Sequence, residues 1–368
     1  MTLSERSATL TYTNSIGAVS VPHISSQPAA VVVGSGYIAN RHVAALRAAN
    51  IPVLGVYSAT PGNSARAARN WGTTAVADVS ALLDLPHATH VHICTPTTSH
   101  DAFVNEALDR ELAVVCEKPL TTSGRIARTL ADRAGSLGVE NFVTFNRRHD
   151  GGIQLFRSLY ASGEVGTAVG VYGLYQQEWN APISSKDWRF DPSQVGPSRV
   201  VSEIGSHWLD LAEFVTGLRI TEVASATANM GEREFLQDGT RGRFTPTNED
   251  TFSSLLRFSN GALGTVMATQ LAHGAWDDIG LRVDGTTGSL YWDSSAPGRV
   301  ALSRKGQGTT ILGVGGPTTS IETMIEAIYH DGGGSCATFF DGLRNCMVQD
   351  AVLESAADHR WTSVRDYS

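Results

Sequence analysis

Residues 31–39 read Val31-Val32-Val33-Gly34-Ser35-Gly36-Tyr37-Ile38-Ala39, and this stretch decides the first part of the fold. It joins an apolar run to the start of a helical pattern with the spacing G-x-G-x-x-A. Gly34 permits a tight turn, Gly36 lets the backbone approach a pyrophosphate, and Ala39 keeps helix and strand close. The N–H groups at such a helix start attract phosphate, so the stretch predicts a dinucleotide site; a glycine-rich turn without a ligand is the alternative. The expected cofactor contacts in this loop are Gly34, Gly36, Tyr37 and Ile38.

Short apolar segments alternate with helical patterns from residue 29 to about residue 150. The alternation predicts βαβ units and therefore a Rossmann domain, a doubly wound parallel sheet in an α/β fold. The expected strands are Ala29–Val33, Val53–Tyr57, Val91–Cys94, Leu112–Cys116 and Asn141–Phe145. The expected helices are Asn40–Ala49, Ser64–Trp71, Asp101–Arg110 and Ser123–Leu137.

Strand-like alternation dominates after about residue 150. It predicts a C-terminal α+β domain with a large, open, mostly antiparallel sheet. The expected strands are Val165–Gln176, Val223–Met230, Asp250–Phe258, Ala262–Gln270, Gly280–Val283 and Gly288–Trp292. The other expected segments are helices near Ser206–Thr216, Ile321–Tyr329 and Ser335–Ala357, and a loop at 303–318. The chain thus divides into a flexible N-terminal extension (1–28), a Rossmann dinucleotide-binding domain (29–150) and a substrate-binding and oligomerisation domain (151–368).

Composition excludes several classes of protein. Of 368 residues, 42% are hydrophobic, and 28 Lys and Arg against 36 Asp and Glu give a net charge of −8. This balance favours neither a nucleic acid nor an anionic membrane as partner, and no run of about 20 apolar residues predicts a membrane span. The start of the chain lacks the pattern of a secretory signal. Its four cysteines form no CxxC, so a cytoplasmic location without disulfides or zinc is expected.

The second expected strand lacks the acidic residue that usually binds the ribose hydroxyls of NAD. Between Gly34 and Ala77 there is no Asp or Glu, although the stretch holds four arginines. A carboxylate would repel a 2′-phosphate, whereas hydroxyl and guanidinium groups accept it. The stretch therefore favours NADP modestly, with Ser58 and Arg66 or Arg69 as expected contacts. Solvated arginines on a helix face are the alternative.

Two loops follow strands of the predicted parallel sheet and should face the cofactor, because ligands bind at the carboxyl ends of such strands. They are Thr95-Pro96 and Glu117-Lys118-Pro119. Pro119 holds Lys118 in an extended conformation, which limits where its ammonium group can point. A lysine that lies near the positive charge of the cofactor and is partly removed from water can have a lowered pKa. A strand-end surface lysine is the alternative.

A histidine flanked by carboxylates lies in the second half of the chain. If residues 203–210 are helical, Glu203, His207 and Asp210 lie on one side. Such carboxylates would orient the imidazole and keep it basic, as proton transfer requires. A structurally satisfied histidine behind a helix-capping glutamate is the alternative.

Together these motifs resemble the glucose–fructose oxidoreductase / inositol dehydrogenase / rhizopine-catabolism (Gfo/Idh/MocA) family. The resemblance covers roughly residues 29–300, and it is carried by the residues of the following motifs. They are Gly34-Ser35-Gly36-Tyr37-Ile38-Ala39, Thr95-Pro96 with His100, Glu117-Lys118-Pro119, and Gly205-Ser206-His207-Trp208-Leu209-Asp210. The resemblance implies dimers or tetramers formed through the open sheet, and NAD(P)-linked oxidation or reduction of sugars and cyclitols.

The resemblance also assigns roles to residues. Lys118 matches the active-site lysine of the family and His207 its catalytic histidine. Glu203 stands where the family usually has Asp and would orient His207 or bind a substrate hydroxyl. Arg148 falls where the family has an arginine near the domain junction. The implied cofactor contacts are Thr95, Pro96, His100 and Glu117, and the implied substrate contacts are Lys118, Arg148, Glu203 and His207.

Aromatic and polar residues interleave at 175–180 and 186–189, a pattern that suits the apolar faces and hydroxyl edges of a sugar ring. Trp179 and Lys186 are the expected contacts, with ordinary strand packing as the alternative. The spacing of the histidines at 87, 90 and 92 is similar to that of metal ligands. The buried parallel strand expected there and the lack of a nearby carboxylate in the sequence argue against a metal site. No metal is expected.

Three functions remain open from the sequence. The first is a sugar or cyclitol dehydrogenase or reductase, in which Lys118→Ala and His207→Ala should each cost orders of magnitude in kcat. The second is an NAD-dependent glycosidase of the same family, which would release an aglycone with only catalytic cofactor. The third is a non-catalytic nucleotide sensor, which the presence of both Lys118 and His207 disfavours.

Overall fold

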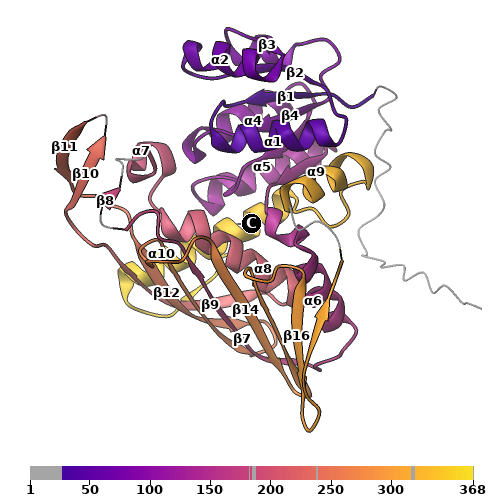
Figure 1. Ribbon diagram of the computed structural model, residues 1–368, viewed down its shortest axis with the longest axis vertical. Coiled ribbons are helices and arrows are strands. Elements are labelled where there is room, and N and C mark those ends of the chain that lie inside the picture. The colour runs from indigo at the N-terminus through magenta and orange to yellow at the C-terminus, as the bar shows by residue number, and fades with distance from the viewer. Residues whose placement is uncertain (1–26, 182, 185–187, 238, 316–319, 368) are drawn as a thin grey trace, which may run out of the picture.

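A six-stranded parallel sheet forms the upper part of the molecule (Figure 1). The computed structural model describes residues 27–181, 183–184, 188–237, 239–315 and 320–367. In spatial order the strands are β3 (Thr74–Ala75), β2 (Val53–Tyr57), β1 (Ala30–Val33), β4 (His90–Ile93), β5 (Ala113–Cys116) and β6 (Asn141–Val143). The accompanying helices are α1 (Tyr37–Ala48), α2 (Pro61–Trp71), α3 (Val79–Leu83), α4 (His100–Leu108) and α5 (Gly124–Leu137). This confirms the predicted Rossmann sheet.

A nine-stranded sheet forms the lower part (Figure 1). Its order is β17 (Gly308–Gly313), β16 (Arg299–Arg304), β15 (Gly288–Asp293), β14 (Asp278–Gly285), β7 (Ala168–Gln176), β13 (Leu263–Thr269), β12 (Thr251–Phe258), β9 (Ile220–Ala228) and β18 (Thr362–Ser363). Only the β7–β13 pair is parallel among these neighbouring described strands, so the predicted mostly antiparallel sheet is confirmed. A smaller sheet of β8 (Ile183–Ser184), β10 (Arg233–Gln237) and β11 (Thr240–Phe244) projects beyond the strand ends of the large sheet (Figure 1).

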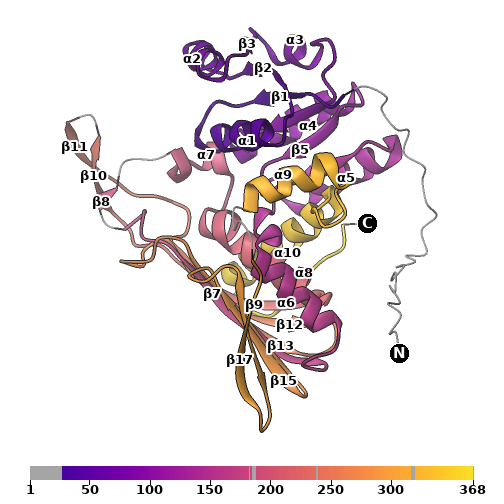
Figure 2. The same cartoon turned by 45° about the vertical axis from the view of Figure 1, so that its right-hand side comes forward.

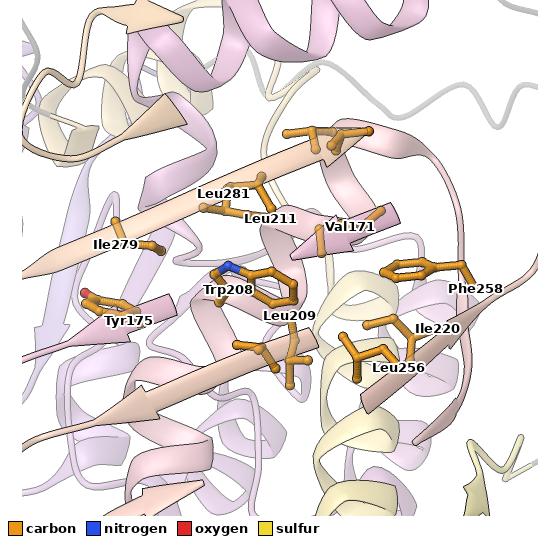
Figure 3. Close-up of a cluster of buried hydrophobic side chains, with 14 of the residues drawn as sticks. Val171, Tyr175, Trp208, Leu209, Leu211, Ile220, Leu256, Phe258, Ile279 and Leu281 are labelled. Carbon is orange, nitrogen blue, oxygen red and sulfur yellow. The ribbon is translucent and has the colours of Figure 1, made fainter. Parts of the chain in front are cut away.

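Helix α8 (Ser206–Thr216) packs its apolar side chains on the inner face of the large sheet (Figure 3). Trp208 is fully buried, and its Nε1 donates a hydrogen bond of 2.9 Å to the carbonyl oxygen of Gly280. Gly173 makes room for the indole, since a Cβ there would lie 2.6 Å from that nitrogen. Truncating a buried tryptophan costs roughly 3–5 kcal/mol, so this packing fixes α8 firmly on the sheet.

The last two helices connect both halves of the molecule (Figure 2). Helix α9 (Ser320–His330) buries Ile321 and Ile325 against Leu46 of α1, within one apolar cluster. Helix α10 (Phe339–Asp358) contacts α5 of the Rossmann sheet and β9 of the large sheet. The carboxyl edge of the Rossmann sheet is therefore held in a fixed position over α8.

Several local features differ from the sequence predictions. The loop expected at 303–318 is wrong in part, because β16 and β17 pair there as an antiparallel hairpin at the sheet edge. An edge strand rich in Gly and Thr carries little hydrophobic periodicity, which explains the error. Helix α6 (Gly151–Ala161), helix α7 (Pro192–Val195) and the β10–β11 hairpin were not expected.

The described part of the chain contains no helix that is long and apolar enough to cross a membrane. All but two residues of the expected N-terminal extension (1–28) lie outside the described residues.

Candidate active site

A cleft of about 900 Å³ follows the carboxyl edge of the Rossmann sheet, between that sheet and the segment that leads into α8. Its walls contain most of the expected cofactor residues. These are Gly34, Gly36, Tyr37, Ile38, Ser58, Arg66, Thr95, Pro96 and Glu117. The cleft continues to Lys118, Trp188, Arg189 and Glu203, which bring the C-terminal half of the chain to its end.

The glycine-rich loop leaves space for a phosphate group. Gly34 has a φ of +113°, and a Cβ there would lie 2.4 Å from the carbonyl oxygen of Cys94, so this position requires glycine. Gly36 precedes α1, has no side-chain cap and would have no atom within 4 Å of an added Cβ. The first N–H groups of a helix have no partner within the helix and attract anions. The loop therefore fits the pyrophosphate of a dinucleotide.

At one end of the cleft, hydroxyl and guanidinium groups occupy the place of the usual acidic residue. Ser58 follows β2, and the hydroxyl groups of Ser35 and Ser58 are 3.1 Å apart in a hydrogen bond. Arg66 donates from an Nη to the Oδ1 of Asn63 at 2.9 Å, and both side chains line the cleft. The guanidinium group and the Ser58 hydroxyl thus line the same cleft, to which the second strand and the helix after it contribute no acidic residue.

His100, one of the expected cofactor contacts, does not lie in the cleft wall. It is buried, and its two ring nitrogens lie 2.9 Å from the carbonyl oxygen of Thr95 and 3.0 Å from that of Pro119. Burial lowers the pKa of this imidazole. A neutral imidazole has a single N–H, so His100 donates to one of these two carbonyl oxygens. It therefore lies between the two cleft loops and outside the cleft lining.

Lys118 lies at the junction of the two halves of the molecule. Its Nζ donates a hydrogen bond of 2.9 Å to the main-chain carbonyl oxygen of Glu203, in the π-helical turn η4 (Val201–Gly205) that runs directly into α8. Its own main-chain N–H lies 3.2 Å from Oε2 of Glu117, in a hydrogen bond. The ammonium group is therefore held one helical turn before His207.

His207 is buried at the start of α8 and is not among the residues that line the cleft, although Lys118 and Glu203 are. Its ring is packed edge-on against Phe145 and tilted against Tyr175. Its Nδ1 has no hydrogen-bond partner within the described part of the chain. Burial, together with the positive charges of Lys118 and Arg147, holds the pKa of His207 well below its usual range. The imidazole is therefore neutral at physiological pH, with an unused nitrogen.

The two carboxylates expected to flank His207, those of Glu203 and Asp210, pair with other side chains. The oxygens of Glu203 have other partners, because Oε1 lies 2.8 Å from Nε of Arg189 and Oε2 accepts from Nε2 of Gln270 at 3.1 Å. Asp210 pairs with Arg148. The expectation that carboxylates keep His207 basic is wrong, because both nearest candidates neutralise arginines while two cations face the ring.

Arg148 also differs from its expected role. It is buried, and it donates to Asp210 at 2.8 and 2.6 Å and to Asp341 at 3.1 Å, with its guanidinium group 4.6 Å from the ring centre of Phe214. This guanidinium group holds α8 and α10 together. The structure therefore gives Arg148 a packing role outside the cleft lining, whereas a substrate contact was expected.

The neighbouring Arg147 faces His207 instead and was missed. Both arginines lie in the short helical turn η2 (Asn146–His149), where adjacent side chains point in different directions. Arg147 pairs with Asp277 and, at 3.4 Å, with Asp150. Asp277 also accepts from the hydroxyl of Tyr175 at 2.6 Å and from Gln177 at 2.8 Å. The sequence offered no means of choosing between two consecutive arginines.

Aromatic groups surround Arg189 near the end of the cleft. The guanidinium carbon lies 4.5 Å from the ring centre of Trp188 and 5.1 Å from that of Trp179. Trp179 is partly exposed, and its Nε1 donates to Oε1 of Gln177. The expected substrate residue Lys186 lies outside the described residues.

Two family models match this chain. The oxidoreductase family with an NAD-binding Rossmann fold matches residues 29–145, and the GFO/IDH/MocA C-terminal domain matches residues 153–291. The chain belongs to the Gfo/Idh/MocA family. The membership confirms the resemblance, the NAD-binding Rossmann domain and the expected class of oxidoreductase.

The chain is similar to enzymes of known name. It is 28% identical over 384 residues to the levoglucosan dehydrogenase of Pseudarthrobacter phenanthrenivorans, covering 92% of this chain and 98% of that one. It is 29% identical over 195 residues to the inositol 2-dehydrogenase of Renibacterium salmoninarum, covering 52% of this chain and 56% of that one. A solved levoglucosan dehydrogenase in complex with NADH and L-sorbose superposes with a TM-score of 0.85 at 25% identity, over 93% of this chain and 100% of the other.

Proposed function

We propose that the protein is an NAD(P)-dependent dehydrogenase or reductase that acts on a ring hydroxyl or ketone of a sugar, sugar derivative or cyclitol. The observation that carries the proposal is the neutral, buried His207, whose Nδ1 has no partner among the described residues and whose ring lies close to the Lys118 charge. A buried nitrogen without a hydrogen bond is costly in a folded protein, so it indicates a group that a ligand completes.

The residues of the chain divide the work with the cofactor. The nicotinamide, when bound, supplies the group that accepts or donates the hydride. His207 accepts the hydroxyl proton during oxidation and returns it during reduction, and its lowered pKa keeps it in the accepting form. Lys118 donates a hydrogen bond to the same substrate oxygen and stabilises its developing negative charge. Glu203, Arg189 and Gln270 form a polar wall beside these two groups.

A sugar or cyclitol suits this environment. The partly exposed indoles of Trp179 and Trp188 offer apolar faces, and Arg189, Gln177 and Glu203 offer donors and acceptors for hydroxyl groups. The enzymes named above act on an anhydrosugar and on inositol, according to their names. These relatives support the substrate class, and Lys118, His207, Glu203 and Trp179 are the proposed contacts.

We infer a preference for NADP over NAD. Ser58 and Arg66 line the cleft where an acidic residue would repel a 2′-phosphate. The opposite result, a lower KM for NAD, would refute this preference while leaving the rest of the proposal intact.

The open face of the large sheet supports the proposed homodimer or homotetramer. Side chains of β12 and β13 alternate between buried and exposed, and the exposed set includes the apolar Leu255, Leu263 and Met267. Apolar side chains gathered on one exposed face are typical of a surface that another subunit covers.

A spectrophotometric screen at 340 nm tests the proposed function. Pyranoses, anhydrosugars and inositols are offered with NAD and with NADP, and their ketones with the reduced cofactors. Stoichiometric formation or loss of reduced cofactor with at least one substrate is expected. Release of an aglycone with only catalytic cofactor would support the glycosidase alternative, and no cofactor binding at all would refute the proposal.

A further inference from the structure

Four side chains with titratable groups form a buried chain of hydrogen bonds behind the cofactor cleft. It runs from Glu117 to His42 of α1, then to His92 of β4, and ends at Tyr329 of α9. The distances are 3.0 Å from Oε1 of Glu117 to Nε2 of His42, 2.8 Å between the Nδ1 atoms of the two histidines, and 2.8 Å from Nε2 of His92 to the hydroxyl of Tyr329. His42 and His92 have no exposed surface, and the proposed mechanism uses neither.

The chain begins at the cleft. Glu117 is only 8% exposed, yet it contributes to the cleft wall directly before Lys118. One carboxylate oxygen accepts from the main-chain N–H of Lys118 and the other from His42. A carboxylate at a cofactor cleft accepts hydrogen bonds from hydroxyl or amide donors, which a nicotinamide nucleoside carries. It does so at full strength only when it is ionised.

Burial alone would protonate this carboxylate, because removing a charge from water is costly. When Glu117 is ionised, two proton arrangements satisfy the histidine pair: His42 donates from both nitrogens and is charged, or His92 donates and His42 is neutral. A protonated Glu117 would instead donate to a neutral His42, but the neighbouring charge of Lys118 favours the ionised carboxylate. The buried carboxylate of Glu117 selects the first, since a neutral His42 would leave that charge without its nearest counter-charge. His42 then donates to Glu117 and to His92, and His92 donates to Tyr329.

The protonation behaviour of the group agrees with this arrangement. Burial opposes a charge on His42, but Cys94 and Glu117 outweigh it and raise the pKa of His42. The pKa of His92 falls well below its usual value because of burial and the neighbouring charge of His42. For Glu117, burial is outweighed by His42 and Lys118, which together lower its pKa.

The other titratable groups facing this ion pair do not replace His42. Cys94 and Cys116 are buried, and burial is the main cause of their raised pKa values. A cysteine carries no positive charge in either protonation state, so neither can replace His42 as the counter-charge of Glu117. His100 has a lowered pKa, again chiefly through burial. His90 packs against the ring of Tyr329 at 4.4 Å, and burial lowers its pKa to about 4. Among the described residues, Lys118 is the other positive charge that lowers the pKa of Glu117, and its Nζ donates a hydrogen bond to the main-chain carbonyl oxygen of Glu203.

We propose that His42 is a positioning residue for the cofactor, because its charged imidazole, clamped between Glu117 and His92, keeps Glu117 ionised and aimed at the cleft. The inference rests on the cofactor cleft of the proposed function and adds a residue that does not itself touch the ligand. Tyr329 extends the same chain into the C-terminal part of the molecule, so α9 contributes to cofactor binding from behind the sheet.

Fluorescence titration with NADH and NADPH between pH 5.5 and 9 tests this inference through the dissociation constant, without turnover. His42→Gln retains a donor toward Glu117 but has no charge. We expect near-constant affinity with pH in the wild type. In His42→Gln, affinity should fall by about tenfold per pH unit below the raised pKa of Glu117, because one proton then competes with binding.

Two further variants separate positioning from a general loss of structure. Glu117→Gln should bind weakly with no such pH dependence, and His42→Gln in that background should cost no further affinity. If His42→Gln does not fold, Tyr329→Phe removes only the far end of the chain and should move the same pH profile in the same direction by a smaller amount.

The possible outcomes are distinct. Equal affinity and an equal pH profile in wild type and in the folded His42→Gln variant would overturn the inference. It would also be overturned if His42→Gln weakened nucleotide binding as much in the Glu117→Gln background as it does in the wild type. If the wild type binds neither nucleotide, the proposed function itself fails.

Discussion

Replacing His207 by Asn is the sharpest perturbation of the proposed chemistry. General acid–base catalysis contributes roughly 10²–10⁴ in rate, so we expect kcat to fall by about 10³, or about 4 kcal/mol of barrier. The fold should tolerate the change. The Nδ1 of His207 makes no hydrogen bond within the described chain, and the ring contacts Phe145 and Tyr175 at centroid distances of 6.1 and 6.2 Å. Losing two such contacts costs about 1–2 kcal/mol, a Tm decrease of about 2–8 °C.

The assay is steady-state oxidation followed at 340 nm, with thermal unfolding measured in parallel. His87→Asn is the matched control, because His87 is exposed and has a φ of +70° that Asn adopts readily, so its kcat should not change. In the wild type, the acidic limb of kcat/KM should lie well below pH 6.5, since burial and two cations keep the free imidazole neutral. A folded His207→Asn that retains kcat within threefold of the wild type would refute the assignment.

Further predictions concern the cofactor, the substrate and stability. Ser58→Asp should move the ratio of kcat/KM for NADP to that for NAD toward NAD by more than tenfold, because the carboxylate repels a 2′-phosphate; an unmoved ratio would contradict the proposed contact. Glu203→Asp should release Arg189 from its 2.8 Å pair and raise the sugar KM about fivefold, which corresponds to about 1 kcal/mol, with kcat within threefold. Burial lowers the pKa of His90 from 6.5 to about 4, so the unfolded chain binds more protons between these pH values and stability is lost as the pH falls. Between pH 6.5 and about 4, urea unfolding should show the free energy of unfolding of His90→Gln rising, relative to that of the wild type, by about 1.4 kcal/mol for each pH unit of decrease, and a constant difference would contradict the shift.

The fold was largely predictable because its determinants are local. The glycine-rich loop, the apolar strands that follow one another to residue 143 and the alternation in β12 and β13 each leave a pattern in the sequence. Pairs of residues that meet only when distant segments pack together leave no such pattern in the sequence. Arg147 pairs with Asp277 and Arg148 with Asp210, and these ion pairs decide which arginine lies near His207. Neither pairing can be inferred from two consecutive arginines in the sequence.

The same limit applies to histidines. His42 lies in α1 and His92 in β4, 50 residues apart, and only the sheet order β1–β4 brings them to a 2.8 Å contact. In the sequence, His92 is part of a histidine cluster for which no metal was expected, and no role was predicted for His42. The basicity of His207 was misjudged for a related reason, since Lys118 and Arg147 approach it from distant segments.

The most direct test of the central claim follows one hydrogen atom. A substrate found in the screen is deuterated at the carbon that bears the reacting hydroxyl, and the reduced cofactor is analysed by mass spectrometry. Direct hydride transfer predicts one deuterium on the nicotinamide for each ketone formed. Turnover of that substrate with no deuterium on the cofactor would contradict the proposed function.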